Sequence, residues 1–313
     1  MSLPTRAIGD LRVSAVGLGC MPMSFPDMVD HRERAIATIH RALDLGITFL
    51  DTSNIYAPAW DAIGHNEALV AEALRTYSGD ADLDAVVVTT KGGLTRSEGE
   101  VWGRDSTADG LRAACEASLR ALDISSIDLY QHHRHDPALT YREQMRSVAA
   151  LREAGLVRRV GLSNVTAPEL AVALDELGAP ADGGVVSVQN EWSPRFRGEP
   201  DVLGMCTELG IAFLPWSPLG GSTQAHDIGS RYRDFALVGD EIGATAQEVV
   251  LAWLLRTTPV MIPIPGATRP TTVDSIVRSV TMTLTDEQQL RLDATSAHME
   301  SMYPEDQPRS PLQ

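Results

Sequence analysis

The sequence contains very little lysine. Of its 26 basic residues, 25 are arginine and one, Lys91, is lysine. This scarcity excludes a phosphate-binding P-loop, which needs Gly-Lys-Ser/Thr, and the Tyr-x-x-x-Lys pair of short-chain dehydrogenases. One explanation is that codon bias removed the other lysines and left Lys91 by chance; the alternative is that Lys91 occupies a position that needs a compact ammonium rather than a planar guanidinium.

Positive charge is scarce overall. The 313 residues carry a formal net charge of -16 at pH 7, and the sequence contains no run of basic residues that could form a positive patch. Such a chain would repel a polyphosphate backbone, so the composition argues against nucleic-acid binding.

Cysteines and long apolar runs are also few. Cys20, Cys115 and Cys206 are widely spaced and form no Cys-x-x-Cys pair, which argues against a disulfide framework and a thiolate zinc site. The first ten residues lack the apolar core of a signal peptide, and nowhere do 18 apolar residues run together. The expectation is a soluble cytoplasmic protein that does not span a membrane.

Short apolar, β-branched runs alternate with amphipathic helical patterns. Such runs are typical of strands buried on both faces, and the alternation indicates parallel pairing through right-handed crossovers. Eight strands without a flexible linker predict an α/β fold, a closed (β/α)8 TIM barrel that forms one domain over residues 1–313; a doubly wound open sheet is the alternative. The eight runs are Ala15 to Gly19, Phe49 to Asp51, Val86 to Thr90, Ile127 to His132, Val157 to Leu162, Val185 to Gln189, Ala212 to Trp216 and Val260 to Pro263.

Several helix starts carry a capping box, in which a first residue caps the helix and an acid or amide three residues later reaches back to it. Each box falls just before a helical apolar pattern, so the helices are expected to begin there. The pairs are Asp30 with Glu33, Thr140 with Glu143, Thr166 with Glu169, Thr245 with Glu248 and Thr285 with Gln288.

Four segments extend the barrel pattern. Residues 1–14 contain a hairpin signal around Gly9-Asp10 that could cap the barrel floor. Long loops are expected at Gly92 to Ser106 and at Ser217 to Gly243, and residues 297–313 form a tail without helical period. Long loops after barrel strands surround the active site in this fold class.

Titratable side chains stand where three expected strands end. Asp51 closes the second strand, Lys91 the third and His132-His133 the fourth, and Tyr56 follows Asp51 by five residues. A tyrosine with a pKa of ~10 is a poor proton donor at neutral pH unless a cation such as Lys91 stabilises its phenolate. Asp51 would orient Lys91, and a histidine would orient a carbonyl group. This pattern predicts general acid catalysis at the barrel mouth.

Five motifs, in order, resemble those of the aldo-keto reductases. The resemblance extends from about Leu11 to about Val280 and implies an NADPH-dependent oxidoreductase of the alcohol dehydrogenase class, which reduces an aldehyde or ketone to an alcohol with Tyr56 as general acid. The motifs are Asp51-Thr-Ser-Asn-Ile-Tyr56, Thr-Thr-Lys91-Gly-Gly, Ile127-Asp-Leu-Tyr-Gln-His-His133, Val160-Gly-Leu-Ser-Asn164 and Trp216-Ser-Pro-Leu-Gly220.

The resemblance also assigns the catalytic residues. The family's Asp-Tyr-Lys-His tetrad is matched by Asp51, Tyr56, Lys91 and His133. His133 is preferred to His132 because the family pattern has an apolar residue at the place of His132.

Further matches imply a cofactor site. Ser163, Asn164 and Gln189 match positions that hold the nicotinamide carboxamide, and Trp216 matches an aromatic residue, usually tyrosine, that stacks on the nicotinamide ring. Helix capping by Ser163-Asn164 and core packing by Trp216 are alternative roles. The other matched positions are Gly19, Cys20, Met21, Asp51, Ser217, Leu219, Gly220, Gly266 and Arg269.

The stretch from Ile264 to Pro270 departs from the family pattern. It matches the segment that grips the adenosine 2'-phosphate, yet Thr272 replaces a customary arginine and Ser275-Ile276 replaces Glu-Asn. Arg269 is the one obvious phosphate ligand left, and arginine suits bidentate phosphate binding. NADPH is therefore the expected cofactor, with NADH as an alternative.

Two other functions compete with a reductase. A cofactor-binding regulatory subunit with little turnover is disfavoured by the intact tetrad. His132, His133, His135 and Asp136 suggest a metal-dependent hydrolase or lyase, but no second motif completes a metal site, so no metal is expected. The expected partner is a small-molecule carbonyl substrate, and the sequence specifies no oligomeric state. The side chains expected to form walls of the substrate pocket are Met23, Phe25, Trp60, Trp102 and Trp192.

Overall fold

The computed structural model describes residues 3–221, 223–297, 300–303 and 311–313. Its main sheet is parallel, and its strands follow the order of the chain from one edge to the other. Most of these strands are buried over their whole length because helices cover the sheet from outside. The strands are β3 (Leu18–Gly19), β4 (Phe49–Asp51), β5 (Val87–Gly92), β8 (Leu129–His132), β9 (Val160–Ser163), β10 (Val185–Gln189) and β11 (Ala212–Phe213).

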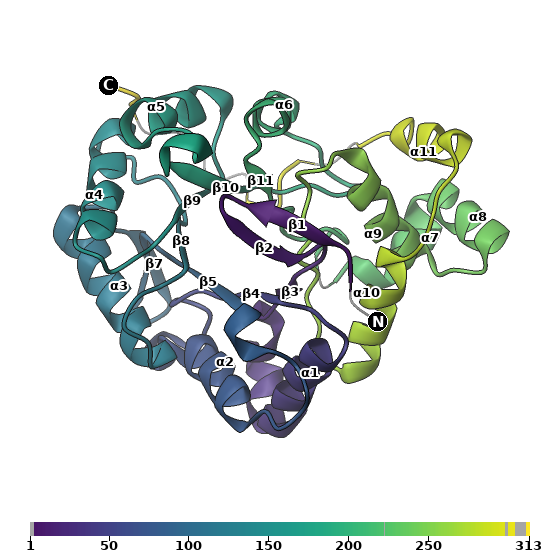
Figure 1. Cartoon of the computed structure of the whole chain (residues 1–313), viewed down its shortest axis with the longest axis horizontal. Coiled ribbons are helices and arrows are strands. Elements are labelled where there is room, and N and C mark those ends of the chain that lie inside the picture. Colours follow the sequence, from purple (N-terminus) through teal and green to yellow (C-terminus); the bar gives the residue numbers. More distant parts are fainter. Residues whose placement is uncertain (1–2, 222, 298–299, 304–310) are drawn as a thin grey trace.

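The helices form a ring around the strands (Figure 1). Each strand is followed by a helix, and neighbouring helices pack against each other around the ring. The helices are α1 (Arg32–Asp44), α2 (His65–Thr76), α3 (Ala108–Leu122), α4 (Tyr141–Glu153), α5 (Ala167–Leu177), α6 (Pro200–Leu209), α7 (Ile228–Arg231), α8 (Arg233–Ile242), α9 (Ala246–Thr257), α10 (Pro270–Val280) and α11 (Asp286–Asp293).

The barrel closes through residues 260–266, which form bridges rather than a regular strand. Ile262 N donates to Phe213 O at 2.8 Å, and Gly19 N donates to Pro265 O at 3.0 Å, so this segment joins β11 to β3. Pro263 and Pro265 have no N–H, and alternating prolines therefore interrupt the ladder. The predicted (β/α)8 barrel is confirmed, with its eighth strand reduced to this segment.

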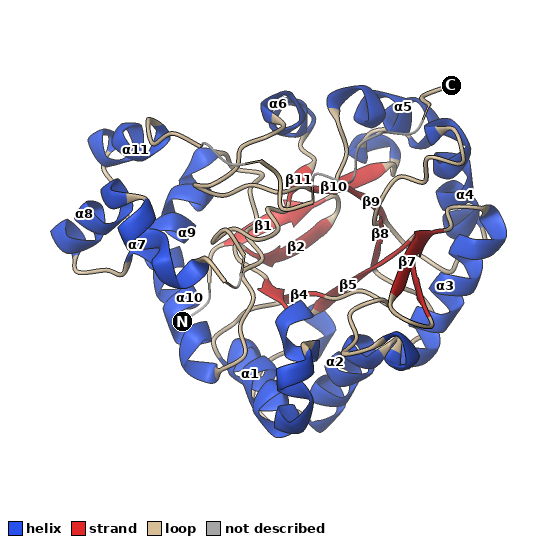
Figure 2. Cartoon of the chain, turned by 180° about the vertical axis from the view of Figure 1, so that it is seen from behind, coloured by secondary structure: helices blue, strands red, loops and turns tan. Residues whose placement is uncertain are grey.

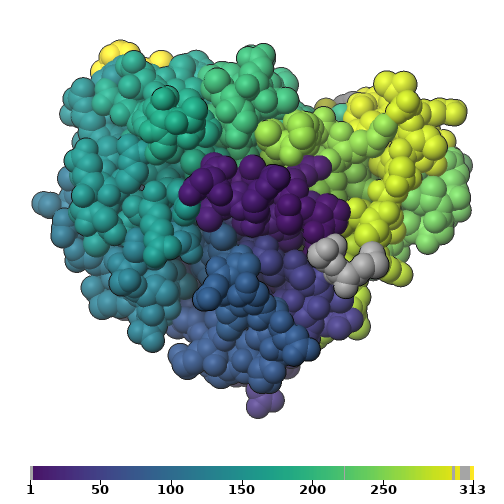
Figure 3. Space-filling model, in the orientation of Figure 1, coloured from purple at the N-terminus to yellow at the C-terminus, as the bar shows by residue number. Residues whose placement is uncertain are grey.

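The predicted hairpin cap is also present. Strands β1 (Thr5–Ile8) and β2 (Leu11–Ser14) pair antiparallel and lie across one end of the barrel (Figures 1 and 3). Ile8 and Val13 pack with the side chains that begin the barrel strands, among them Phe49, Val87 and Leu129. The hairpin therefore fills the end at which the strands start, and their carboxyl ends face the opposite side.

The hairpin turn depends on glycine. Gly9 has φ +59, and a Cβ atom there would lie 2.7 Å from Val186 Cγ1. A side chain at this position would both strain the backbone and collide with the barrel floor.

Four of the five expected capping boxes are present, at Thr140, Thr166, Thr245 and Thr285. The expectation for Asp30 was wrong. Residues Pro26–His31 form a 3-10 helix that runs directly into α1, so Asp30 lies inside a helical turn and caps nothing.

The two long loops contain secondary structure of their own. Gly92 to Ser106, the expected long loop after the third strand, holds an antiparallel hairpin, β6 (Leu94–Ser97) and β7 (Val101–Arg104). Ser217 to Gly243 holds α7 and α8. Figure 2 shows the loops over the barrel end away from the amino-terminal hairpin. Much of the expected tail, 297–313, lies outside the described residues.

Candidate active site

The carboxyl ends of the barrel strands bring Asp51, Tyr56, Lys91 and His133 together. Asp51 is the last residue of β4, Lys91 lies near the end of β5, His133 directly follows β8, and Tyr56 lies in the loop after β4. Parallel strands end on the same side of a barrel, which is why residues far apart in sequence meet there.

Lys91 is the centre of this cluster. Its Nζ atom donates to Asp51 Oδ2 at 2.8 Å, to the Thr52 carbonyl oxygen at 2.8 Å and to the Tyr56 hydroxyl at 3.1 Å. An ammonium has three N–H bonds, so these acceptors use all of them. Lys91 is fully buried, and Asp51 is nearly so.

The charge of Lys91 is secured by its partners. Burial alone would lower the pKa of Lys91, but the charge and hydrogen bond of Asp51, together with Tyr56, outweigh burial and raise that pKa above its ordinary value. Lys91 is therefore a permanent cation at neutral pH.

Tyr56 keeps its proton at neutral pH. Burial raises the pKa of Tyr56, and Lys91 offsets this only in part, so the pKa of the phenol lies above its ordinary value. The sequence suggested that a cation would make Tyr56 more acidic. Lys91 does act in that direction, but removal of the phenol from water is the larger effect in this protein.

His133 packs edge-on against Tyr56, with ring centres 5.9 Å apart. Its Nδ1 atom hydrogen-bonds with Ser53 Oγ at 3.3 Å. Burial lowers the pKa of His133 well below its ordinary value, and the nearby charge of Lys91 lowers it further. The ring is therefore a neutral imidazole, able to donate from one nitrogen and accept at the other.

The neighbouring His132 points elsewhere. Its Nε2 atom hydrogen-bonds with Ser106 Oγ at 2.9 Å, and its ring packs edge-on against Tyr141 on α4. Burial lowers the pKa of His132 to about 3. Adjacent residues at a strand end face opposite sides, so His133, and not His132, lies beside Tyr56.

A group of polar side chains continues the network across the mouth. Gln189 Nε2 donates to Asp51 Oδ1 at 2.8 Å, and Ser163 Oγ donates to the Gln189 carbonyl oxygen at 2.8 Å. Asn164 Nδ2 donates to Ser163 Oγ at 2.7 Å, and Trp216 Nε1 donates to Asn164 Oδ1 at 3.0 Å. Hydrogen bonds and the Gln189 backbone thus join Trp216 to Asp51.

Of the alternative roles, helix capping by Ser163 and Asn164 is not seen, whereas core packing by Trp216 is seen in part. The helix after β9 is capped by Thr166, not by Ser163 or Asn164. Trp216 is half-buried: it packs against the core cluster that contains Leu214 and Ile262, and its ring lies 5.7 Å from that of Tyr303.

The β6–β7 hairpin turns one face toward the mouth. Arg96 and Trp102 are cross-strand partners and therefore share a face. Arg96 donates to the Ala57 carbonyl oxygen at 2.7 Å and lies over the Trp102 ring at 5.1 Å. Arg104, on the same face, donates to the His135 carbonyl oxygen at 2.9 Å. The hairpin is thus fastened to the loops that carry Tyr56 and His133.

The side chains expected to wall the pocket differ in their exposure. Trp102 is 55% exposed although its face is turned toward the mouth, and Trp60, four residues after Tyr56, is 37% exposed. Phe25 is partly exposed, whereas Met23 is buried, so the expectation that Met23 walls the pocket was wrong. Trp192 was expected as a wall but is buried against Phe213, so that expectation was wrong.

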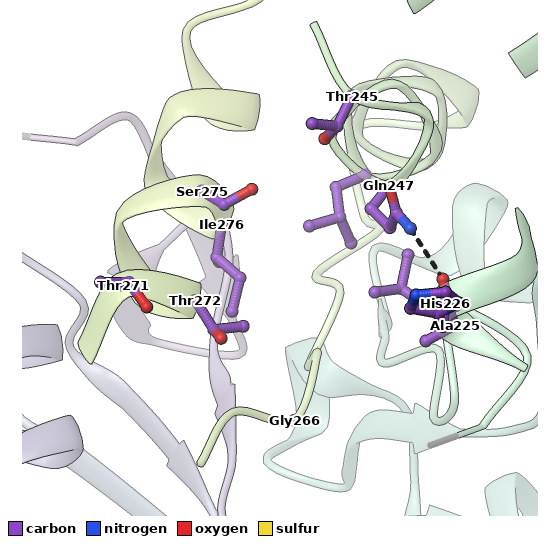
Figure 4. Close-up of a pocket in the computed structure, with 11 residues that line it drawn as sticks. Ala225, His226, Thr245, Gln247, Gly266, Thr271, Thr272, Ser275 and Ile276 are labelled. Atoms are coloured by element: carbon purple, nitrogen blue, oxygen red, sulfur yellow. Dashed lines mark hydrogen bonds between the residues drawn. The ribbon is translucent and has the colours of Figure 1, made fainter. Parts of the chain in front are cut away.

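A cleft beside the mouth is lined by two of the residues expected to bind a cofactor, Leu219 and Gly266. Figure 4 shows side chains of α10 on one side, with Gln247 and His226 opposite and Gly266 below. The cleft has a volume of about 400 Å³. Its lining residues are Leu219, Ala225, His226, Thr245, Gln247, Leu251, Gly266, Thr271, Thr272, Ser275 and Ile276.

The remaining expected cofactor residues lie near this cleft or at the strand ends. Gly19 ends β3; Cys20 after it is buried, and Met21 is exposed. Ser217 and Gly220, in the loop after β11, have φ +48 and +78. Arg269 is exposed at the N-cap of α10.

Sequence reasoning missed several contributors to the site. Thr52 and Ser53 lie inside the motif that contains Asp51, but no spacing marks their contacts with Lys91 and His133. Gln247 and His226 reach the cleft from separate elements, so no local pattern identifies them. The β6–β7 hairpin did carry a signal, the turn sequence Glu98-Gly99-Glu100 between two short alternating runs.

The described residues contain neither a cluster that could hold a metal ion nor a helix that could span a membrane. Among them, no group of three or more His, Cys, Asp or Glu side chains is arranged to hold a metal ion. His132, His133 and His135 instead contact Ser106, Ser53 and Arg104. None of the helices in these residues is both long and apolar enough to span a membrane.

Comparison with known proteins gives consistent matches. Residues 15–297 match the sequence model of the aldo/keto reductase family. An uncharacterized oxidoreductase of Schizosaccharomyces pombe is 34% identical over 292 residues, which cover 92% of this chain and 89% of that protein. An aldo/keto reductase from Klebsiella pneumoniae, solved with NADP and acetate, superposes with a TM-score of 0.77 at 23% identity, covering 93% of this chain and 94% of that one. The holo form of a Bacillus halodurans aldo-keto reductase superposes with a TM-score of 0.77 at 24% identity, covering 96% and 99%.

Proposed function

Because the chain belongs to the aldo/keto reductase family, we propose that it is an NADPH-dependent oxidoreductase that reduces an aldehyde or ketone to an alcohol. The observation that carries this proposal is the buried Lys91 ammonium, held by Asp51 and bonded to the Tyr56 hydroxyl at the barrel mouth. A panel of carbonyl compounds, followed by NADPH oxidation and product analysis, tests it. Absence of turnover across aromatic, aliphatic and sugar-derived carbonyls would contradict it.

Tyr56 is the proposed general acid. Bound NADPH would supply a hydride to the carbonyl carbon, and the carbonyl oxygen then needs a proton. The Tyr56 phenol is protonated at neutral pH and can give that proton, and Lys91 stabilises the phenolate left behind. Asp51 keeps Lys91 in place, and neutral His133 can hydrogen-bond to the carbonyl oxygen.

The polar groups of the mouth and cleft fit the proposed cofactor. Asn164 and Gln189 can bind a carboxamide, and the half-buried Trp216 ring can stack on a nicotinamide. The cleft between α9 and α10 can receive the adenosine end, because the amino terminus of α10 and exposed Arg269 favour a phosphate there. Arg278 of α10 is paired with Glu248, so its charge is already compensated.

Replacing Arg269 by Ala should raise the Kd for NADPH roughly tenfold and leave the Kd for NADH nearly unchanged. Loss of one charge-assisted hydrogen bond, worth about 1.5 to 3 kcal/mol, accounts for this change. Titration of each cofactor by fluorescence measures both constants. Arg291→Ala, a change of an arginine on α11, is the control and should alter neither. Equal weakening of both cofactors by Arg269→Ala would show that Arg269 has a structural role.

We propose further that the substrate carries a planar apolar group that packs on Trp102, because Trp102 is 55% exposed and shares a hairpin face with Arg96, which is bonded to the loop that carries Tyr56. Replacing Trp102 by Ala should then raise KM for naphthaldehyde roughly tenfold, through loss of about 1.4 kcal/mol of aromatic contact, and leave KM for propanal unchanged. Val101→Ala is the control, because Val101 lies on the opposite face of the same hairpin. Equal changes for both aldehydes would contradict the packing role.

We also infer a cytoplasmic location. The three cysteines are buried and unpaired, which suits a reducing compartment. Fluorescence microscopy of the tagged full-length chain in its native cell tests this location.

A further inference from the structure

The indole N–H of Trp216 fixes the orientation of Asn164. It donates to Asn164 Oδ1 at 3.0 Å. An indole N–H only donates, so it must meet the amide oxygen, and the amide nitrogen must point away from it. That nitrogen donates to Ser163 Oγ at 2.7 Å and to the carbonyl oxygen of His133 at 3.1 Å.

The hydrogen bond from the Asn164 amide to the His133 carbonyl oxygen lies just beyond the end of strand β8. Strand β8 ends at His132. The His133 N–H still donates to Gly92 O, at 2.9 Å, but its carbonyl oxygen is held by the Asn164 side chain. Asn164 is itself constrained, since its φ is +61 and its N–H donates to Gln189 O at 3.0 Å. The last fixed point of the His133 backbone is therefore the Asn164 amide.

We propose that Trp216 is a positioning residue for His133, acting through the hydrogen bond from its indole N–H to Asn164. This role is additional to any contact of its ring face with a cofactor, and it rests on the proposed function of His133. A phenylalanine at position 216 keeps a flat ring but has no N–H. The Asn164 amide would then lose the hydrogen bond that orients its oxygen, would depend on Ser163 and His133 for its remaining side-chain hydrogen bonds, and would hold the His133 carbonyl less firmly.

Other contacts of Trp216 need a control. Its ring also lies near Tyr303, at 5.7 Å, and below the Arg134 guanidinium, at 5.9 Å. Trp192 offers a matched comparison. It is a buried indole whose N–H has no hydrogen-bond partner among the described residues. Trp192→Phe therefore removes the same atoms as Trp216→Phe but breaks no hydrogen bond, and it should leave turnover unchanged.

The kinetic experiment is a double-mutant cycle with Trp216→Phe, Asn164→Ala and the double variant, with an aldehyde that the wild type reduces. At saturating NADPH, Trp216→Phe should lower kcat about tenfold, within the range expected for lost alignment of a reacting group. Its Kd for NADPH should change by less than about threefold, because the ring face is retained. The double variant should be no slower than Asn164→Ala, because both changes interrupt one pathway. Losses that multiply in the double variant would overturn the proposal.

A second readout needs neither cofactor nor substrate. In the protein with labelled histidines, assigned with a His133→Ala variant, Trp216→Phe and Asn164→Ala should both shift the imidazole signals of His133. Trp192→Phe should leave them in place. Unchanged His133 signals in Trp216→Phe would overturn the positioning role. This result stands apart from the proposed reductase activity, whose failure would show only as absent turnover in the wild type.

Discussion

Tyr56→Phe should lower the rate of carbonyl reduction by at least about a hundredfold, the lower range for loss of a general acid. The substitution removes the proton that the carbonyl oxygen needs and keeps the ring that packs against His133. The Kd for NADPH should change little. Stopped-flow measurement of NADPH oxidation in a single turnover isolates this step from product release.

The pH profile of the wild type gives the matching control. Tyr56 acts as an acid only while protonated, and burial raises its pKa above the ordinary value. The rate of reduction should therefore stay constant around neutral pH, where Tyr56 is protonated. It should fall in the alkaline range as Tyr56 loses its proton. Single-turnover rates above half the wild-type value in Tyr56→Phe, with chemistry limiting, would remove Tyr56 from the acid role.

Lys91 should tolerate neither Met nor Arg, although this chain uses Arg at every other basic position. Its single nitrogen makes three hydrogen bonds, to Asp51, Thr52 and Tyr56. A guanidinium nitrogen carries at most two hydrogens and belongs to a larger planar group. Arg would therefore keep the positive charge, but no single nitrogen of it could make all three hydrogen bonds. A displacement of ~1 Å can cost on the order of a hundredfold in rate. Steady-state and single-turnover assays of Lys91→Arg and Lys91→Met measure this loss.

Lys91→Met should also destabilise the fold, because it leaves the buried Asp51 carboxylate without its counter-charge. Removing one partner of a buried ion pair typically costs about 3 to 5 kcal/mol. The double variant Asp51→Asn/Lys91→Met should regain much of this stability in thermal and denaturant unfolding and regain no activity. Near wild-type reduction by Lys91→Arg, with an unchanged pH profile, would contradict the special role of the ammonium.

Sequence patterns predicted the barrel well where local chemistry specifies an element. The Thr140, Thr166, Thr245 and Thr285 boxes mark helix starts correctly because all their interactions fall within four residues. The Asp30 box failed because the preceding residues were already helical. Whether the residues before an expected cap are already helical depends on tertiary packing, and a four-residue pattern carries no information about that packing.

The closing strand and the β6–β7 hairpin were harder to predict. Pro263 and Pro265 reduce the eighth strand to bridges because missing N–H groups break the ladder, yet the apolar pattern persists. The hairpin is hard to predict because each of its strands has only four residues. Its stability comes from contacts of Arg96 and Arg104 with other loops, which are remote in sequence.

The ends of the predicted strands indicated where the four expected catalytic residues lie, but they did not indicate the direction of the pKa shift of Tyr56 or the side-chain hydrogen bonds around the site. The choice of His133 over His132 came from the family pattern, in which an apolar residue stands at the place of His132, and alternation along β8 explains why the two histidines face opposite ways. The raised pKa of Tyr56 depends on burial by distant segments, so the sequence suggested the opposite net direction. The bond from Trp216 to Asn164 joins residues 52 positions apart through side-chain geometry alone.

The most direct test of the proposed activity uses NADPH with deuterium on the carbon that gives up the hydride. The wild type, incubated with an aldehyde, should produce an alcohol with one deuterium on the former carbonyl carbon and one NADP+ per alcohol, as read by mass spectrometry. Tyr56→Phe should bind the same cofactor and form little of this product. A wild-type protein that binds NADPH tightly but transfers no deuterium to any carbonyl would contradict the reductase and favour a cofactor-binding regulatory protein.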